Sequence, residues 1–230
     1  MFRQKNFLLM CLAVICMTVA CFGKVSAQIS PIRYETDIYD GDESADFEEE
    51  NLKLADESKH LTGAGVTMIG DSIMNGNRKI ILGQLPDAYI DAKGSRDICG
   101  GFEAAQKLQA EGKLSDVVIV ELGTNGSLVN PGYYSTGMQN MLELLGTERQ
   151  IFWVTVYCSY SQYMAANNKY IWELANTRRN IIVIDWYSLA VQNPEWFPDG
   201  VHPNTEGARQ FAKLLQESLE ARYGIGNNVE

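Results

Sequence analysis

The sequence has few histidines, few cysteines and no excess of positive charge. Among its 230 residues, 19 Lys and Arg stand against 29 Asp and Glu, for a formal net charge of −10. No basic stripe runs along the chain, which argues against nucleic-acid binding. The two histidines are His60 and His202, and no group of His, Cys and carboxylate residues has the spacing of metal ligands. The sequence therefore predicts neither a nucleic-acid partner nor a metal site.

Cysteine is also scarce outside the first residues of the chain. Three of the five cysteines lie before residue 22, which leaves Cys99 and Cys158. An even pair in an oxidising compartment is compatible with a disulfide. If the two follow the second and fourth strands of an open sheet, however, they lie roughly 14 Å apart, whereas a disulfide needs Cα atoms within about 7 Å. Two unpaired thiols are the favoured expectation, and a bridge through long loops stays open.

Residues 1–27 have the pattern of a targeting segment. Arg3 and Lys5 precede an apolar run from Phe7 to Phe22, and the small residues of Val25-Ser26-Ala27 favour cleavage directly after them. The run is long for a signal peptide and short for a spanning helix. An uncleaved anchor and a lipoprotein modified at Cys21 therefore stay open beside the cleaved signal peptide. All three interpretations place the rest of the chain outside the cytoplasm.

The next segment, residues 28–62, has the composition of a solvated tether. Between Glu35 and Glu57 there are eleven acidic residues and one basic residue, Lys53. With few large apolar side chains, such a stretch cannot offset the entropy cost of ordering. We therefore expect a disordered acidic spacer at 28–62, a folded domain at 63–224 and a short tail at 225–230.

From residue 65 onward, short apolar runs alternate with amphipathic stretches. The runs are β-branched and continuous, as are strands of a parallel sheet covered on both faces. They lie at Val66–Ile69, Ala88–Ile90, Val117–Leu122, Ile151–Val156 and Ile181–Ile184. Helices are expected around Lys79–Leu85, Ile98–Glu111, Tyr133–Leu145 and Tyr163–Arg178, and a last helix begins after Asn204 and closes at Gly224. This alternation predicts an α/β fold, a three-layer α/β/α sandwich.

The segment Gly70-Asp71-Ser72 directly follows the first expected strand. In open α/β sheets, ligands bind at the carboxyl ends of the strands. Ser72 then stands near the start of a helix, where unpaired N–H groups and the helix dipole stabilise negative charge. These features make Ser72 a candidate nucleophile, although the same residues also fit a simple Asp/Ser helix cap.

Two further loops supply candidate partner groups. Asp199 and His202 lie three positions apart, so one turn can aim the carboxylate at one imidazole nitrogen and leave the other to accept a serine proton. His202 is the one candidate base of the folded part, because His60 ends the tether; a surface or capping histidine is the alternative. Asn125 follows the third strand and can donate to an oxyanion, although Asn125-Gly126 is also a turn dipeptide.

The order of these segments resembles the SGNH (GDSL-type) hydrolase superfamily over roughly Val66 to Tyr223. More narrowly, the chain is similar to the extracellular catalytic domain of peptidoglycan O-acetyltransferases. The segments that carry this likeness are Ile69-Gly70-Asp71-Ser72-Ile73-Met74, Glu121-Leu122-Gly123-Thr124-Asn125-Gly126, Asp185-Trp186-Tyr187 and Asp199-Gly200-Val201-His202. Many members of the superfamily have Asp where Gly126 stands here, and this departure favours the acetyltransferase branch.

The resemblance implies a flavodoxin-like five-stranded parallel sheet and a triad of Ser72, His202 and Asp199. It also implies an oxyanion hole made by the Ser72 N–H, the Asn125 side chain and a second backbone N–H. That second N–H matches Ser95, with Gly94 beside it, where the superfamily usually has glycine. No metal and no organic cofactor is implied.

The expected function is that of an extracytoplasmic serine esterase or O-acyltransferase for acetyl esters of cell-wall or other glycans. The expected partners are an acyl ester donor and a glycan or water acceptor. The membrane acyltransferase part of the similar proteins is missing from the chain, so either a separate membrane protein delivers the acyl group or the protein hydrolyses esters. A non-catalytic glycan-binding module on the same fold and a lipid esterase are the alternatives.

Overall fold

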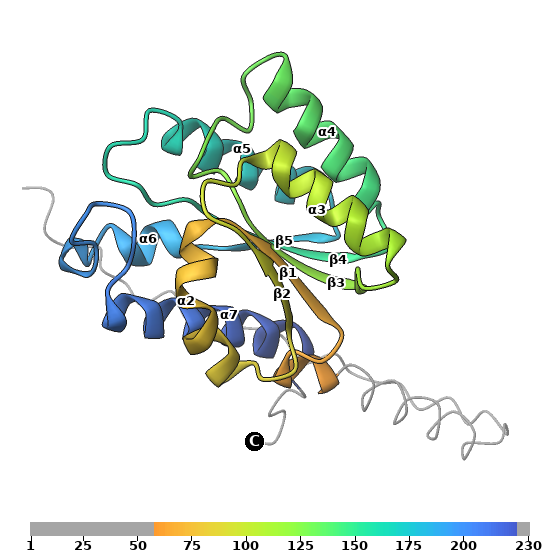
Figure 1. Cartoon of the computed structure of the whole chain (residues 1–230), viewed down its shortest axis with the longest axis horizontal. Helices are drawn as coiled ribbons and strands as arrows, with labels where there is room; N and C mark the ends of the chain where they lie inside the picture. The colour runs from red at the N-terminus through yellow and green to blue at the C-terminus, as the bar shows by residue number, and fades with distance from the viewer. Residues whose placement is uncertain (1–57, 225–230) are drawn as a thin grey trace, which may run out of the picture. The chain divides into compact units, whose positions relative to one another are not determined.

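A computed structural model describes residues 58–224 and contains one parallel sheet of five strands (Figure 1). The strand order is β2-β1-β3-β4-β5, with every neighbouring pair parallel. The strands are β1 (Val66–Gly70), β2 (Tyr89–Ala92), β3 (Val117–Glu121), β4 (Gln150–Val154) and β5 (Ile181–Ile184). Each lies within two residues of the range expected from the sequence, because continuous β-branched runs are typical of buried parallel strands.

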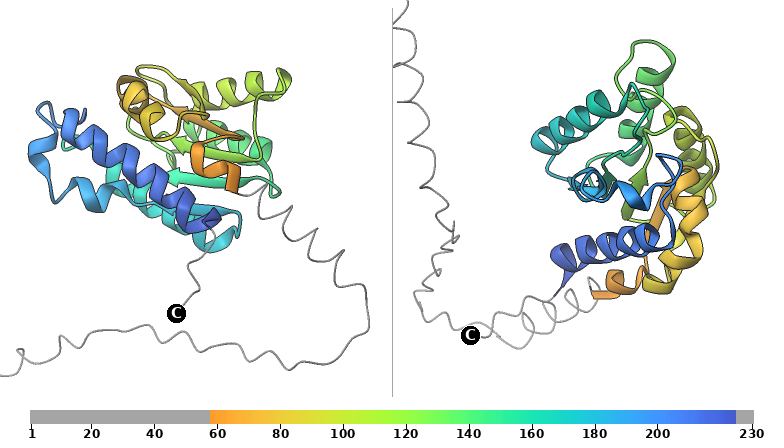
Figure 2. Two further views of the ribbon diagram at one scale, coloured as in Figure 1. Left: turned by 90° about the horizontal axis from the view of Figure 1, so that it is seen from below. Right: turned by 90° about the vertical axis from the view of Figure 1, so that its left-hand side faces the viewer.

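Helices cover both faces of the sheet, which gives the expected three-layer sandwich (Figures 1 and 2). One face carries α3, α4 and α5, and the other carries α2, α6 and α7. The helices are α2 (Ser72–Gln84), α3 (Ile98–Ala110), α4 (Tyr133–Leu145), α5 (Met164–Thr177), α6 (Trp186–Ala190) and α7 (Thr205–Tyr223), with the 3₁₀ helices η1 (Lys59–Thr62) and η2 (Pro194–Trp196).

The core lies in two apolar layers, one on each side of the sheet. Phe211 of α7 and Trp186 of α6 pack in the first layer, and Trp153 of β4 packs in the second. All three side chains are fully buried. Full burial of a large apolar side chain contributes about 1.5–3 kcal/mol, so these layers fix the strands whose ends carry the site.

The strand register brings three chain segments level at the carboxyl edge of the sheet. Gly70 at the end of β1 pairs with Glu121 of β3 on one side and with Ala92 of β2 on the other. The loops that follow these three strands therefore start beside one another. This is the edge at which open α/β sheets bind their ligands.

The folded part begins earlier than the sequence indicates. Residues 59–62, assigned above to the disordered tether, form η1, and His60 is buried there. Its ring lies 4.7 Å from the ring of Tyr223, between centroids, and its Nδ1 lies 2.8 Å from the Ala64 carbonyl oxygen. The tether boundary at residue 62 is therefore wrong, because an aromatic contact to the last helix holds a segment whose composition alone favours disorder.

Two helices also differ from the prediction. Helix α2 begins at Ser72 rather than near Lys79, because the Asp71 carboxylate caps its first turn. The polar residues of that turn hide the apolar periodicity. Helix α6 was not predicted, since its five residues are too few for a helical period to show.

Cys99 and Cys158 are both buried and both free, as the spacing of their strands leads one to expect. The predicted targeting segment 1–27 and the tail 225–230 lie outside the described residues. Within residues 58–224, no helix combines the length and the apolar character that a membrane crossing needs.

Candidate active site

Ser72 is the first residue of α2 and follows the turn at Gly70 and Asp71 that ends β1. The turn requires glycine at position 70, because a Cβ there would lie 2.5 Å from the Cβ of Met74. Asp71 caps the helix by accepting a hydrogen bond from the Ile73 N–H at 2.9 Å. The Ser72 hydroxyl therefore sits at the positive end of a 13-residue helix, where developing negative charge is stabilised.

Ser72, His202 and Asp199 form one continuous hydrogen-bonded row. The Ser72 Oγ lies 2.9 Å from His202 Nε2, although the two residues are 130 positions apart. His202 Nδ1 lies 2.7 Å from Asp199 Oδ2. The row has the geometry of a nucleophile, a base and a group that orients the base. The structure thus brings together all three residues that the sequence singled out.

The loop between Phe197 and Asn204 is folded around the Asp199 carboxylate. Asp199 Oδ1 accepts hydrogen bonds from the N–H groups of Val201 at 3.0 Å and His202 at 2.8 Å. The His202 N–H, together with the imidazole, holds the pKa of Asp199 well below its usual range. Asp199 is therefore a carboxylate at neutral pH, and its Oδ2 is placed to orient the imidazole beside it.

Asn125 lies in the loop after β3 and contacts the residue before Ser72. Its Nδ2 donates to Asp71 Oδ2 at 3.0 Å and to the Arg96 carbonyl oxygen at 3.3 Å. The first bond fixes the amide plane. The second is long, so a stronger acceptor such as an oxyanion can displace it.

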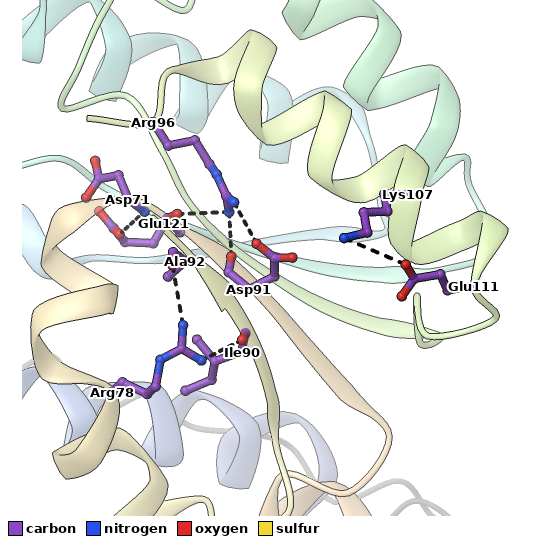
Figure 3. A network of polar contacts seen from close by, with 10 residues as sticks. Asp71, Arg78, Ile90, Asp91, Ala92, Arg96, Lys107, Glu111 and Glu121 are labelled. Atoms are coloured by element: carbon purple, nitrogen blue, oxygen red, sulfur yellow. Dashed lines mark hydrogen bonds and ion pairs between the residues drawn. The ribbon is translucent and has the colours of Figure 1, made fainter. Parts of the chain in front are cut away.

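Ser95 lies in the loop after β2, next to the Arg96 carbonyl that faces Asn125. Its φ of 57° falls in the left-handed region, where glycine is favoured. The loop is anchored by the Arg96 guanidinium, which donates to the Gly70 carbonyl at 3.2 Å and to the Asp91 carboxylate at 2.6 Å (Figure 3). The Arg96 side chain is largely buried and links β1 to β2 through these bonds.

A pair of buried carboxyl groups lies beneath these residues and was not singled out from the sequence. Asp71 is 0% exposed and Glu121, the last residue of β3, is 5% exposed. Burial raises the pKa of Glu121 well above its ordinary value, with the neighbouring Asp71 charge adding to the shift. The sequence feature that could have pointed to this pair is Glu121 itself, an acidic residue at the end of the otherwise apolar strand β3.

Three tyrosines follow β4, namely Tyr157, Tyr160 and Tyr163. One of them is exposed to solvent beside the site. Tyr160 is 70% exposed and lies against Gly200 of the Asp199 loop. Tyr157 is buried against the ring of Phe197, 4.3 Å away between centroids, and Tyr163 precedes α5. Within the part of the chain that the structure describes, no group of three or more His, Cys, Asp or Glu residues is placed to hold a metal ion.

Comparison with solved structures supports the topology found here. The C-terminal catalytic domain of peptidoglycan O-acetyltransferase A from Streptococcus pneumoniae superposes with a TM-score of 0.60 at 24% identity, over 69% of this chain and 94% of that one. A GDSL-like lipase from Bacteroides thetaiotaomicron superposes with a TM-score of 0.59 at 16% identity, over 77% of this chain and 98% of that one. The fold is that of the SGNH (GDSL-type) hydrolases.

Sequence similarity points to the same group of proteins. The O-acetyltransferase OatA of Staphylococcus aureus is 26% identical over 170 residues, which cover 73% of this chain and 27% of that protein. The chain thus spans about a quarter of the length of this curated relative. No family model matches the chain. The relatives found by sequence are named as O-acetyltransferases.

Proposed function

We propose that the protein is a serine acyl-transfer enzyme that moves or removes acetyl groups on cell-wall glycans. The observation that carries this proposal is the row of Ser72, His202 and Asp199, with contacts of 2.9 Å and 2.7 Å. A side chain that only capped a helix would not need an imidazole aligned on its hydroxyl. The likeness to peptidoglycan O-acetyltransferases supports acetyl as the acyl group and peptidoglycan as the acceptor.

In the first half-reaction, the Ser72 Oγ attacks the carbonyl carbon of an acetyl ester. A bond forms between Oγ and carbon, the serine proton passes to His202 Nε2, and the carbonyl oxygen becomes an oxyanion. The bond from carbon to the leaving oxygen then breaks, and the imidazolium returns the proton to that oxygen. Asp199 keeps Nδ1 protonated throughout and stabilises the imidazolium.

The oxyanion is held by hydrogen-bond donors from three loops. These donors are the Ser72 N–H at the helix start, the Asn125 amide and the N–H of Ser95 or of Gly94. Asn125 donates once its long contact to the Arg96 carbonyl is replaced. One such donor is worth about 10²- to 10³-fold in rate.

In the second half-reaction, water or a sugar hydroxyl attacks the acetyl-serine, and His202 now acts as the base. Water gives an esterase and a sugar hydroxyl gives a transferase. The predicted targeting segment at 1–27 supports action outside the cytoplasm, where a separate membrane protein would supply the acetyl donor to a transferase.

Mass spectrometry of the intact protein tests the proposal and separates the two outcomes. After incubation with a small acetyl ester, we expect a mass increase of one acetyl group that maps to Ser72. Addition of muropeptides should move the label to sugar if the protein is a transferase, whereas release as acetate alone indicates an esterase. A protein that binds muropeptides but never carries acetyl on Ser72 would be a glycan-binding module, and the proposal would fail.

Tyr160 offers a prediction about the glycan itself. Its exposed ring beside Gly200 can stack on a sugar next to the triad, so Tyr160→Ala should raise KM for a glycan substrate. Loss of about 1 kcal/mol of apolar burial corresponds to about fivefold in KM. The kcat/KM for p-nitrophenyl acetate, which cannot reach the ring, should stay unchanged.

The matched control for that change is Tyr89→Ala. Tyr89 is also an exposed tyrosine, but it begins β2 and therefore lies at the opposite end of the strands from the site. Steady-state kinetics on both substrates make the comparison. Equal KM values for the glycan in wild type and Tyr160→Ala would remove Tyr160 from the substrate site.

A further inference from the structure

Two buried carboxyl groups, those of Asp71 and Glu121, lie next to each other beneath the site. Burial of one isolated charge is already unfavourable, and two adjacent carboxylates cannot both ionise without a large penalty. The pair must therefore share a proton, and the hydrogen bonds of the individual oxygens indicate which group carries it.

Asp71 has the surroundings of the ionised member. Its Oδ1 accepts the Ile73 N–H at 2.9 Å, and its Oδ2 accepts the Asn125 amide at 3.0 Å. Both Asp71 oxygens thus accept an N–H donor, which leaves neither free to carry a proton and stabilises the charged form. Burial raises the pKa of Asp71, and the hydrogen bond from the Ile73 N–H opposes that rise.

Glu121 has the surroundings of the protonated member. Its Oε2 accepts the backbone N–H group of Asp71 at 3.1 Å (Figure 3) and that of Met74 at 3.4 Å. These two bonds occupy one oxygen and leave Oε1 to carry the proton. Burial and, after it, the neighbouring Asp71 charge raise the pKa of Glu121 well above its ordinary value, so Glu121 is the group of the pair that keeps the proton.

We propose that Glu121 is a neutral acid that holds the Asp71 carboxylate in position and, through it, orients the Asn125 amide toward the oxyanion. Glu121 is thus a positioning residue, and it contacts no reacting atom. The inference rests on the proposed function, because it assigns Asn125 to the oxyanion hole. The Glu121 side chain also accepts hydrogen bonds from the backbone N–H groups of Asp71 and Met74, on either side of Ser72. One side chain therefore positions both the nucleophile and the oxyanion donor.

Rate measurements on Glu121→Gln and Glu121→Leu test the proposal with an acetyl ester. Glutamine keeps an oxygen for the two N–H groups and a donor for Asp71, so kcat should stay within about threefold of wild type. Leucine removes both, and kcat should fall about 10²-fold, the worth of one oxyanion donor. Glu103→Gln on the exposed face of α3 is the matched control and should change nothing.

A double-mutant cycle with Asn125→Ala separates positioning from general damage. If Glu121 acts through Asn125, Glu121→Leu should cost less than about threefold in kcat once Asn125 is already alanine. Independent losses that multiply would overturn the proposal, as would a Glu121→Gln variant as slow as Glu121→Leu. If wild type itself lacks activity, the proposed function has failed, and the infrared and unfolding tests below still decide the protonation of Glu121.

The protonation state can be measured without any activity. At pH 7, the infrared spectrum of wild type should contain the carbonyl band of a protonated carboxyl group that is absent from Glu121→Gln. Absence of that band in wild type would show that Glu121 is ionised and would end the proposal. This measurement also remains available if Glu121→Leu fails to fold.

The same proton should appear in the pH dependence of stability. The pKa of Glu121 is raised above its ordinary value of 4.5 in the folded chain, so the folded state binds a proton that the unfolded state has lost. The resulting stabilisation is present below pH 4.5 and is lost as the pH rises through the folded value. Asp71, His202 and Arg96 are the charged or titratable side chains of the surrounding loops, and all are retained in Glu121→Gln. Urea unfolding should therefore show the variant gaining stability relative to wild type as the pH increases from 4 to 8; a pH-independent difference would contradict a raised pKa.

Discussion

Ser72→Ala should abolish turnover of a small acetyl ester, with kcat falling by about 10⁴-fold or more, as expected for loss of a serine nucleophile. The hydroxyl is the only group in the row that can form the acyl-enzyme, so neither His202 nor Asp199 can replace it. The change removes one oxygen from a half-buried position at a helix start, and the Asp71 cap stays in place. Thermal unfolding should therefore be nearly unchanged while activity is lost.

Two comparisons sharpen this prediction. Ser135→Ala is a matched control, because the Ser135 hydroxyl bonds only to the Gly132 carbonyl in the first turn of α4, and it should keep full activity. A serine-reactive phosphonate should label wild type and Ser135→Ala but not Ser72→Ala. Full activity in Ser72→Ala would refute the mechanism, since Ser72 is the residue whose hydroxyl hydrogen-bonds to His202 in the described chain.

The strands and the row of three side chains were predictable because each has a local signature. Continuous β-branched runs such as Val117–Leu122 identify buried strands from their own composition. The spacing of Asp199 and His202 is likewise local, since one turn carries both residues and its N–H groups bond back to the carboxylate. The contact of His202 with Ser72 follows once both loops are placed at one edge of the sheet.

The support beneath the site depends on strand order and register, which no local pattern contains. Glu121 reaches the start of α2 only because β3 lies beside β1 with Glu121 level with Gly70. Arg96 reaches the Gly70 carbonyl only because β2 lies on the other side of β1. In sequence, Glu121 is one acidic residue after an apolar run and Arg96 is one basic residue in a loop. The same limit applies to His60, whose contact with Tyr223 joins the two ends of the domain.

Asp199→Asn should lower kcat by about 10³- to 10⁴-fold although it replaces only one oxygen with an NH₂ group. The asparagine oxygen can still accept the N–H groups of Val201 and His202, so the loop keeps its shape. The new NH₂ group faces His202 Nδ1 and donates to it, which places the imidazole proton on Nε2. An Nε2 that carries a proton cannot accept the proton of Ser72, so the loss comes from the wrong tautomer rather than from misfolding.

Asp97→Asn is the control for the removal of one negative charge. Asp97 caps α3 by accepting the Gly100 N–H at 2.9 Å, and asparagine caps a helix equally well. It should leave both kcat and stability unchanged, whereas Asp199→Asn should lose activity while thermal unfolding stays close to wild type. Kinetics with p-nitrophenyl acetate and calorimetry on the two variants make the comparison. A rate for Asp199→Asn close to that of wild type would mean that Asp199 does not set the imidazole tautomer, and another group would then have to orient His202.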